Sequence, residues 1–317
     1  MARLDERRLA ALIAAKFGVG IIGRLFEHEH LSHVVGLLLT DGREVVVKAR
    51  PFDPRHLSCT RAQRALYFAG FPCARPLCDP LESGDEAVSI EEFVPPPGSV
   101  REYSAPNAAA SARAFRRMLF LASSVWQVSN FSPPPAWLDW DHAGSALWPA
   151  PDDGPEDLNA ISAPGWLTDA AGQLRQVLRS HTGLPIVGHG AWEARNVFWD
   201  GDRLAVVHDW DSLAALPEAA LVGAAAGVFA VVGSAPGWPS LYDSKGFLAG
   251  YLDAREELWR AGEPLDAWTA ADDRVFWAAG LWVHLFNAQK AIARGTFGPD
   301  AERVRQRVRE RLPLTAG

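Results

Sequence analysis

The sequence predicts an α+β fold with a small β-rich N-terminal lobe, residues 1–94, and a larger helical C-terminal lobe, residues 95–317. Three observations support this prediction. Short β-branched runs alternate with turns before residue 95, Pro95-Pro96-Pro97-Gly98 breaks regular structure, and apolar residues then recur with helical spacing. Two unlike lobes of this kind enclose a cleft, and ligands favour such clefts.

The N-terminal lobe is predicted to start with an amphipathic helix that stops at Phe17-Gly18. Apolar runs then predict strands, and Asp41-Gly42 between two of them is typical of a hairpin turn. A second helix stops where Gly70 and Pro72 follow. The predicted ranges are helix 4–15, strands 20–22, 34–39 and 44–49, helix 54–69 and strand 87–94.

The C-terminal lobe is predicted to be mostly helical, with a single β-hairpin. Strands 197–199 and 204–207 flank either Asp200-Gly201 or Gly201-Asp202, and both pairs suit a two-residue turn. A loop rich in Pro, Asp and Trp covers residues 132–165. The predicted helices cover residues 105–128, 166–181, 218–231, 244–261 and 272–292.

Composition and charge exclude several classes of protein. The net charge of −7 argues against nucleic acid as a partner. No run approaches the ~18 consecutive apolar residues that a membrane span needs, and the N-terminal helix lacks the features of a signal peptide. Three cysteines do not make a disulfide framework. We therefore expect a cytoplasmic protein with no membrane partner, either a monomer or a homodimer.

The most informative segment lies between residues 188 and 211, around the predicted hairpin. There Asn196 falls opposite residues 205–207, so Asn196 and Asp209 lie near the same open end, within about 7–8 Å. Their oxygens are hard ligands of the kind Mg²⁺ accepts when it carries nucleotide phosphates. Asp211 is expected to help through a water or by orienting Asp209.

Four residues of this segment carry a resemblance to a known family: His189, Asn196, Asp209 and Trp210. Their spacing resembles the catalytic loop and metal-binding turn of the kinase-like phosphotransferases, most of all the aminoglycoside and related antibiotic phosphotransferases. The resemblance implies a protein-kinase-like two-lobed fold, ATP or GTP with Mg²⁺ as cofactor, and transfer to a hydroxyl. It further implies that His189 orients the loop and that Asn196 and Asp209 bind the metal.

One position departs from the family pattern. Where the resemblance places the catalytic aspartate, this sequence has Ala191, whose methyl group cannot accept a hydroxyl proton. A deliberate replacement of an aspartate, a natural pseudokinase and a substitute base at Glu193 are the three open explanations. The first is favoured because both metal ligands are retained, and Glu193 is expected to pair with Arg195. Loss of a general base costs about 10²–10⁴-fold in rate and should leave binding mostly intact.

The resemblance also places nucleotide contacts in the N-terminal lobe. Lys48, at the end of an apolar strand, resembles the lysine that contacts the α- and β-phosphates, and Ser32 resembles the hydroxyl at the tip of the phosphate-covering turn. Glu92 and Val94 lie where the strand linking the lobes offers backbone groups to adenine.

The glutamate that this family carries on the helix beside its lysine is missing. No acidic residue occurs between Asp53 and Asp79, so Gln63 or a water is expected to satisfy Lys48.

Acidic and aromatic residues of the C-terminal lobe are the candidates for binding the acceptor. An acidic lining complements a cationic antibiotic, and the residues expected to provide it or to contact the acceptor are Asp139, Trp140, Asp141 and Glu218, supported by Asp152, Asp153, Glu156 and Asp157. Alternatively, Trp137, Trp140 and Trp148 form a stacking wall for a macrolide, a cyclic peptide or a nucleobase-like acceptor.

The resulting hypothesis is an ATP-dependent O-phosphotransferase for a small, antibiotic-like and cationic molecule, inactivated at Ala191. The alternative is a natural pseudokinase that binds small molecules under control of a nucleotide. A serine hydrolase does not fit because no G-x-S-x-G elbow is present. A protein kinase does not fit because an A-P-E segment and an activation loop of the expected spacing are missing.

Overall fold

The structure is a computed structural model that describes residues 5–29, 32–95, 105–123, 130–231, 238–261 and 266–316. Ser83, residues 105–107 and Trp259 are described by their backbone alone. The Pro-rich crossing at 96–98 and the predicted helix end at 124–128 lie outside the described residues.

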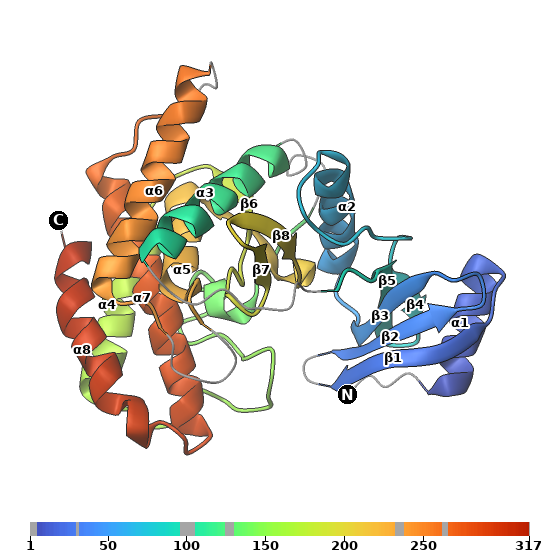
Figure 1. Cartoon of the computed structure of the whole chain (residues 1–317). Coiled ribbons are helices and arrows are strands. Elements are labelled where there is room, and N and C mark those ends of the chain that lie inside the picture. The colour runs from blue at the N-terminus through green and yellow to red at the C-terminus, as the bar shows by residue number, and fades with distance from the viewer. Residues whose placement is uncertain are drawn as a thin grey trace.

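The N-terminal part is an antiparallel five-stranded sheet with the strand order β1-β2-β3-β5-β4 (Figure 1). The helix α1 (Glu6–Phe17) packs on this sheet through Leu9 and Ile13, which share a core with β2 and β3. The ion pair of Arg8 with Glu86, at 2.5 Å, fastens the helix to β5. The strands are β1 (Ile21–Glu29), β2 (His33–Leu39), β3 (Glu44–Pro51), β4 (Leu81–Ser83) and β5 (Glu86–Glu92).

The helix α2 (Arg55–Phe68) follows β3 in the chain, but its apolar face belongs to a different core. Cys59, Ala62 and Leu66 pack with residues of the C-terminal part such as Phe115 and Trp210, whereas the sheet residues form a core with α1. Figure 1 shows α2 beside the β7–β8 hairpin and set apart from β1.

Six helices build most of the C-terminal part (Figure 1). Small residues on α5 let it lie very close to α7, and α3 packs against α6. The helices are α3 (Ala105–Ala122), α4 (Gly165–Ser180), α5 (Glu218–Val228), α6 (Leu241–Arg260), α7 (Ala270–Ala293) and α8 (Ala301–Arg311). No described helix is both long and apolar enough to cross a membrane.

Two short antiparallel strand pairs lie between the helices. The pair β7 (Val197–Asp200) and β8 (Arg203–Val207) is the predicted hairpin, with Gly201-Asp202 as its turn. The pair β6 (Pro185–His189) and β9 (Leu213–Pro217) was not predicted, because each strand is a five-residue apolar run whose partner lies far along the chain.

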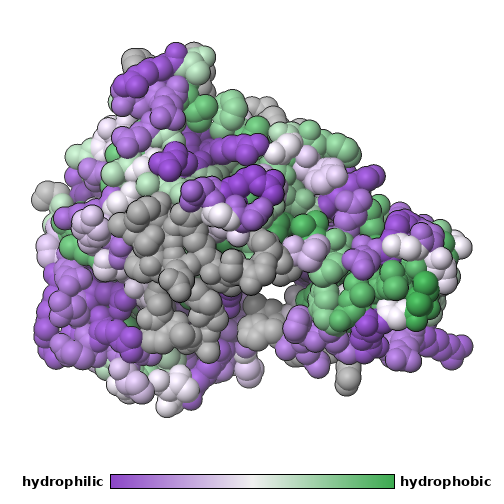
Figure 2. Space-filling view, in the orientation of Figure 1, coloured by the Kyte–Doolittle hydropathy of each residue, from purple (hydrophilic) through white to green (hydrophobic). Residues whose placement is uncertain are grey.

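The α+β class is confirmed, and most predicted elements differ from the structure only at their ends. The sequence prediction also missed β4 and α8. The helix α8 is very polar, with only Val304 and Val308 as buried apolar side chains. Figure 2 shows a mostly hydrophilic surface over α7 and α8, at its lower left.

Candidate functional site

The two strand pairs bring the predicted catalytic loop and the predicted metal-binding turn together. The loop runs from β6 to β7, and the turn runs from β8 to β9. His189 pairs with Leu213 at the end of the β6–β9 ladder, and the Gly190 N–H donates to the Ser212 carbonyl over 2.9 Å. A Cβ at Gly190 would lie 2.6 Å from that same carbonyl, so only glycine fits between His189 and residue 191.

His189 is buried and held in one tautomer. Its Nδ1 accepts a hydrogen bond from the Ala191 N–H over 3.2 Å, so its Nε2 carries the proton and donates to the His208 carbonyl over 2.9 Å. Burial lowers the pKa of His189 and keeps the ring neutral, although the nearby Asp209 works against this shift. The ring packs edge-on against Trp192 and Trp210. His189 thus links the loop to the turn.

Asn196 and Asp209 lie at the same open end of the hairpin, but the register differs from the prediction. A bulge between Phe198 and Trp199 shifts the ladder by one residue, so the His208 N–H donates to the Asn196 carbonyl over 2.9 Å. Asn196 therefore falls opposite residue 208 instead of 205–207. Its side-chain Nδ2 donates to the Ala191 carbonyl over 2.9 Å, which leaves the amide oxygen as a ligand.

Asp209 has a left-handed backbone, with φ 66°, and is the only described non-glycine residue with a positive φ. This costs conformational energy and often marks a functional turn. Its carboxylate forms no ion pair with a described cation under 4 Å, whereas Asp211 pairs with Arg50 of β3. The structure thus leaves Asp209 available to a metal and ties Asp211 to the N-terminal sheet.

Ala191 is buried, with 3% of its surface exposed, and its carbonyl accepts from Asn196 and from the Glu193 N–H. Trp192 anchors the loop, because its Nε1 donates to Ser111 of α3 over 2.9 Å. Glu193 pairs with Arg195, as expected. Burial raises the pKa of Glu193, and the nearby Asp209 adds to this while Arg195 opposes it.

Lys48 has a carboxylate partner that the sequence prediction missed. Its Nζ lies 3.1 Å from Oε1 of Glu91, on the neighbouring strand β5. Gln63 does not contact Lys48, as had been expected; its Nε2 donates to the other oxygen of Glu91 over 2.8 Å. The expectation that Gln63 or a water would satisfy Lys48 was therefore wrong. Only the strand register brings Glu91 and Lys48 together, and a local motif does not reveal it.

A pocket lies between the sheet and the predicted metal-binding turn. Lys48, Arg50 and Glu91 line it from the strands, Gln63 from α2, and Trp210 and Asp211 from the turn. Lys48 also acts electrostatically on His189 and on His208, and it helps burial to lower the pKa of His208 to about 4. The predicted phosphate-binding lysine thus lies close to the predicted metal-binding turn.

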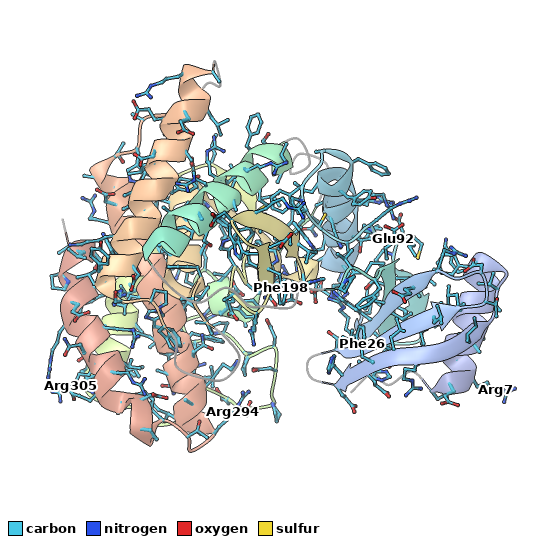
Figure 3. The ribbon with its side chains drawn as sticks, in the orientation of Figure 1. Arg7, Phe26, Glu92, Phe198, Arg294 and Arg305 are labelled. Carbon is cyan, nitrogen blue, oxygen red and sulfur yellow. The ribbon has the colours of Figure 1, made fainter. Side chains whose placement is uncertain are left out.

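The predicted adenine and phosphate contacts lie around the same region. Ser32 lies just before β2, next to His33, whose Nε2 is 2.6 Å from Glu27. The Glu92 N–H donates to the Arg75 carbonyl over 2.9 Å, and no described residue accepts from the Val94 N–H. Phe26 packs against Phe93, and Figure 3 shows Phe26 on the sheet side and Phe198 on the hairpin side of this region.

The residues expected to bind a cationic acceptor are mostly paired with the protein's own cations. Asp141 pairs with Arg179 at 2.8 Å, and Glu218 pairs with Arg255 at 2.9 Å. Asp153 and Glu156 pair with Arg294, the residue directly after α7, each at 3.0 Å. Asp139 has no described cation under 4 Å, and burial raises its pKa.

The prediction that three tryptophans form a stacking wall is wrong, because two of them are buried in the core. Trp140 and Trp148 are 4% and 3% exposed and pack in the core, where neither offers a face to a ligand. Trp137 is half-buried, and its Nε1 donates to the Gly190 carbonyl over 2.8 Å. Trp137 is therefore the tryptophan that lies against the predicted catalytic loop.

The sequence matches no protein-family model and no curated protein. Several solved structures match its fold over nearly the whole chain. The amicoumacin kinase hAmiN, solved with AMP-PNP, Ca²⁺ and amicoumacin, has a TM-score of 0.63 at 13% identity and covers 98% of this chain and 94% of its own.

Two further structures have the same fold. A thermostable mutant of aminoglycoside phosphotransferase APH(4)-Ia, in complex with ADP and hygromycin B, has a TM-score of 0.55 at 15% identity, with coverage of 98% and 99%. Spectinomycin phosphotransferase APH(9)-Ia, in complex with ADP and spectinomycin, has a TM-score of 0.56 at 10% identity, with coverage of 99% and 94%. The kinase-like fold of the antibiotic phosphotransferases is thereby shown for this chain.

Proposed function

We propose that this chain binds a magnesium nucleotide, ATP or GTP, between its N-terminal and C-terminal lobes, with the boundary at residues 94 and 95. We further propose that the scaffold serves phosphoryl transfer to a hydroxyl of a small, antibiotic-like molecule. One observation carries the proposal: a single pocket is lined by Lys48 of the sheet and by Trp210 and Asp211, which directly follow Asp209 in the turn. Solved proteins of this fold bind ADP or AMP-PNP together with antibiotics.

The donor set fits Mg²⁺ that arrives with a nucleotide. The Asp209 carboxylate forms no ion pair with a described cation under 4 Å, and the hydrogen bond from Asn196 Nδ2 to the Ala191 carbonyl leaves the amide oxygen for a ligand. The described residues contain no group of three or more His, Cys, Asp or Glu that could hold a metal alone. One carboxylate and one amide oxygen are what Mg²⁺ uses when phosphates and waters complete its shell.

The chain's own groups are proposed to bind the nucleotide at three points. Lys48 contacts the phosphates, and the Ser32 hydroxyl lies in the turn that covers them. The backbone of Glu92 and Val94 meets the adenine edge, and the Val94 N–H has no described partner that would compete for it. When bound, Mg²⁺ neutralises phosphate charge and holds the phosphates in place.

Ala191 limits the chemistry. In the transfer, a bond forms between the acceptor oxygen and the γ-phosphorus while the bond to the leaving oxygen breaks, and the hydroxyl proton must leave. The Ala191 methyl group cannot take or orient that proton. The Glu193 carboxylate is held by an ion pair with Arg195, so it is a poor substitute base. We infer that this chain binds its substrates and transfers phosphate slowly.

The acceptor is proposed to carry few positive charges. A polycation would need several unpaired carboxylates, and Asp141 and Glu218 are neutralised by Arg179 and Arg255. Asp139, Asp152 and Asp157 have no described cation within pairing distance, but burial raises the pKa of Asp139 and of Asp152 and so disfavours their charged forms. A hydroxyl-bearing molecule with one amine or none suits this charge pattern better than an aminoglycoside with many amines.

The substitution Ala191→Asp tests the proposed transfer. We expect the aspartate to raise acceptor-dependent ADP formation by about 10²-fold or more, with unchanged nucleotide affinity. Glu193→Gln in the same background is the control, and it should retain the gain. If Ala191→Asp binds nucleotide and an acceptor but gains no transfer with any of a panel of antibiotics, the transferase proposal is wrong. That outcome would favour the nucleotide-gated binding protein.

A further inference from the structure

The side chain of Lys48 is held by an ion pair with a residue of the same sheet. Its Nζ lies 3.1 Å from Glu91 Oε1, and 14% of the lysine side chain and 10% of the glutamate side chain are exposed. At this degree of burial an unpaired charge would be costly, so both side chains are held in one arrangement. The carboxylate comes from β5, and the described part of α2 holds no acidic residue.

The strand register explains why these two side chains meet. β3 and β5 are antiparallel, with Lys48 opposite Ser89 and Val46 opposite Glu91. Lys48 and Glu91 are thus diagonal neighbours on the same face of the sheet, a separation that two long side chains can bridge. A shift of one residue in this register would turn one of them to the opposite face.

Gln63 holds the second oxygen of the same carboxylate. Its Nε2 donates to Glu91 Oε2 over 2.8 Å and also to the Ala74 carbonyl over 2.8 Å. Gln63 is 5% exposed and Glu91 is 7% exposed. One oxygen of Glu91 therefore faces Lys48 and the other faces the helix, which fixes the rotation of the carboxylate.

We propose that Glu91 is the positioning residue for the phosphate-binding Lys48, and that Gln63 acts through Glu91 and not on the lysine itself. This inference rests on the proposed nucleotide site. The lysine is consequently placed by two neighbouring strands of one sheet, while α2 contributes only a neutral hydrogen bond.

The packing of α2 supports this division. Its buried side chains Cys59, Ala62 and Leu66 belong to the core of the C-terminal part, and Lys48 and Glu91 lie on strands whose core includes Val47 and Ile90. A displacement of α2 would break the hydrogen bond of Gln63 and leave the ion pair intact. We therefore expect Lys48 to stay in position for the phosphates even when α2 moves.

The variant Glu91→Gln tests the proposal by a difference between ligands. It preserves size and the hydrogen bond from Gln63 but removes the charge next to Lys48. We expect Mg-ADP and Mg-ATP to bind about tenfold more weakly or worse by calorimetry, with adenosine affinity unchanged, because only the phosphates reach the lysine. Glu86→Gln is the matched control on the same strand, since Glu86 pairs with Arg8 of α1 and has no part in the proposed nucleotide site.

Exchanging the carboxylate and the amide between residues 63 and 91 tests whether the lost Mg-ADP affinity can be rescued. In Gln63→Glu combined with Glu91→Gln, the hydrogen bond between residues 63 and 91 is kept and the carboxylate moves to the helix. We expect this double variant to recover at least part of the lost Mg-ADP affinity, a result that a merely structural role of Glu91 does not predict.

The outcomes separate this inference from the proposed function. Failure of the unmodified chain to bind Mg-ADP would reject the nucleotide site itself. If that chain binds Mg-ADP and Glu91→Gln binds it equally well, the positioning role is wrong and the site stands. Equal losses for adenosine and Mg-ADP would show general damage to the strand and would also overturn the positioning role.

Discussion

At the scale of single residues, Asp209 and Asp211 show how two carboxylates in one turn take different tasks. Asp209 has the strained left-handed backbone and forms no ion pair with a described cation under 4 Å, whereas Asp211 pairs directly with Arg50 of the sheet, whose charge also acts on Asp209. Strain of this kind persists where the surrounding structure enforces it, here through hydrogen bonds of the Ser212 N–H and hydroxyl to the Asp209 carbonyl. We therefore propose Asp209 as the metal ligand, while Asp211 ties the turn to the sheet through Arg50.

The pair of variants Asp209→Asn and Asp211→Asn tests this assignment. Asparagine tolerates the left-handed conformation, so Asp209→Asn should fold normally. We expect it to lose the part of the ADP affinity that depends on Mg²⁺, about tenfold or more, and to keep the affinity measured in EDTA. Asp211→Asn should lower thermal stability instead, and a larger loss of Mg²⁺ dependence in Asp211→Asn would reverse the two roles.

The pH dependence of stability follows from His208. Burial is the main cause that lowers the pKa of His208 to about 4, and the positive charge of Lys48 is the second. The folded protein therefore favours the neutral form of His208. The unfolded chain binds a proton near its ordinary pKa, and stability is therefore complete above about pH 6.5 and falls as the pH drops toward 4. Each pH unit in this window costs at most about 1.4 kcal/mol for this group.

The variant His208→Gln isolates that contribution. Urea unfolding at pH 7.5 and pH 5.5 should show a loss of stability that is smaller in His208→Gln than in the unmodified chain, by about 1 kcal/mol. The comparison cancels the titration of other groups such as Glu193, whose raised pKa acts in the opposite direction. Equal losses in both proteins would contradict the lowered pKa of His208.

His189, Asn196 and Asp209 could be predicted because their spacing lies within one short segment around a hairpin. Glu91 could not, since its role depends on the β3–β5 register. The pairing of the acidic residues was equally hidden, because Asp153 and Arg294 meet only when the loop before α4 packs on α7. Sequence spacing reveals local geometry, while charge neutralisation across the fold needs the tertiary structure.

At the scale of elements, α5 and α7 show how small residues set a helix contact. The segment of α5 reads EAALVGAAAGV, and its composition predicts a helix without an amphipathic face. Gly223 lies so close to α7 that an added Cβ would be 2.1 Å from the Phe276 carbonyl oxygen. Backbone atoms cannot move aside as side chains do, so the approach of the two helices requires this glycine.

Gly223→Ala and Gly172→Ala form a matched test of that contact. An alanine at Gly172 of α4 meets nothing within 4 Å and should stabilise the protein by about 0.5–1 kcal/mol through helix propensity. Gly223→Ala gains the same propensity but must push the helices apart, and we expect a net loss of about 1–3 kcal/mol. Urea unfolding measures both, and a stabilising Gly223→Ala would refute the close approach.

The helices of the C-terminal part were predictable where apolar periodicity extended over three or more turns, as in α7. The strands β6 and β9 were not, because a five-residue apolar run has no period of its own and each strand depends on a distant partner. The missed pair holds His189 beside Leu213 and therefore shapes the candidate site directly.

At the scale of the whole molecule, the core of α1 and the sheet is separate from the cores of the C-terminal part. Few polar contacts connect them, among them the pair of Arg50 with Asp211 and the hydrogen bond of Gln63 to Glu91. The helix α2 lies in the N-terminal sequence but shares the core of α3 and the hairpin. The helix α2 therefore belongs to the N-terminal lobe by its position in the sequence, but to the C-terminal part by its packing.

Hydrogen exchange of the unmodified chain tests this division. Elements that share a core tend to open together. We expect amides near Ala62 and Leu66 of α2 to exchange at the rate of α3, and amides of β2 and β3 to exchange at a rate of their own. Mg-ADP should slow exchange in β2 and β3 more than in α2, because the proposed phosphate-binding residue Lys48 lies on the sheet. Exchange of α2 at the rate of the sheet, with α3 distinct from both, would place the helix in the N-terminal unit and contradict the packing.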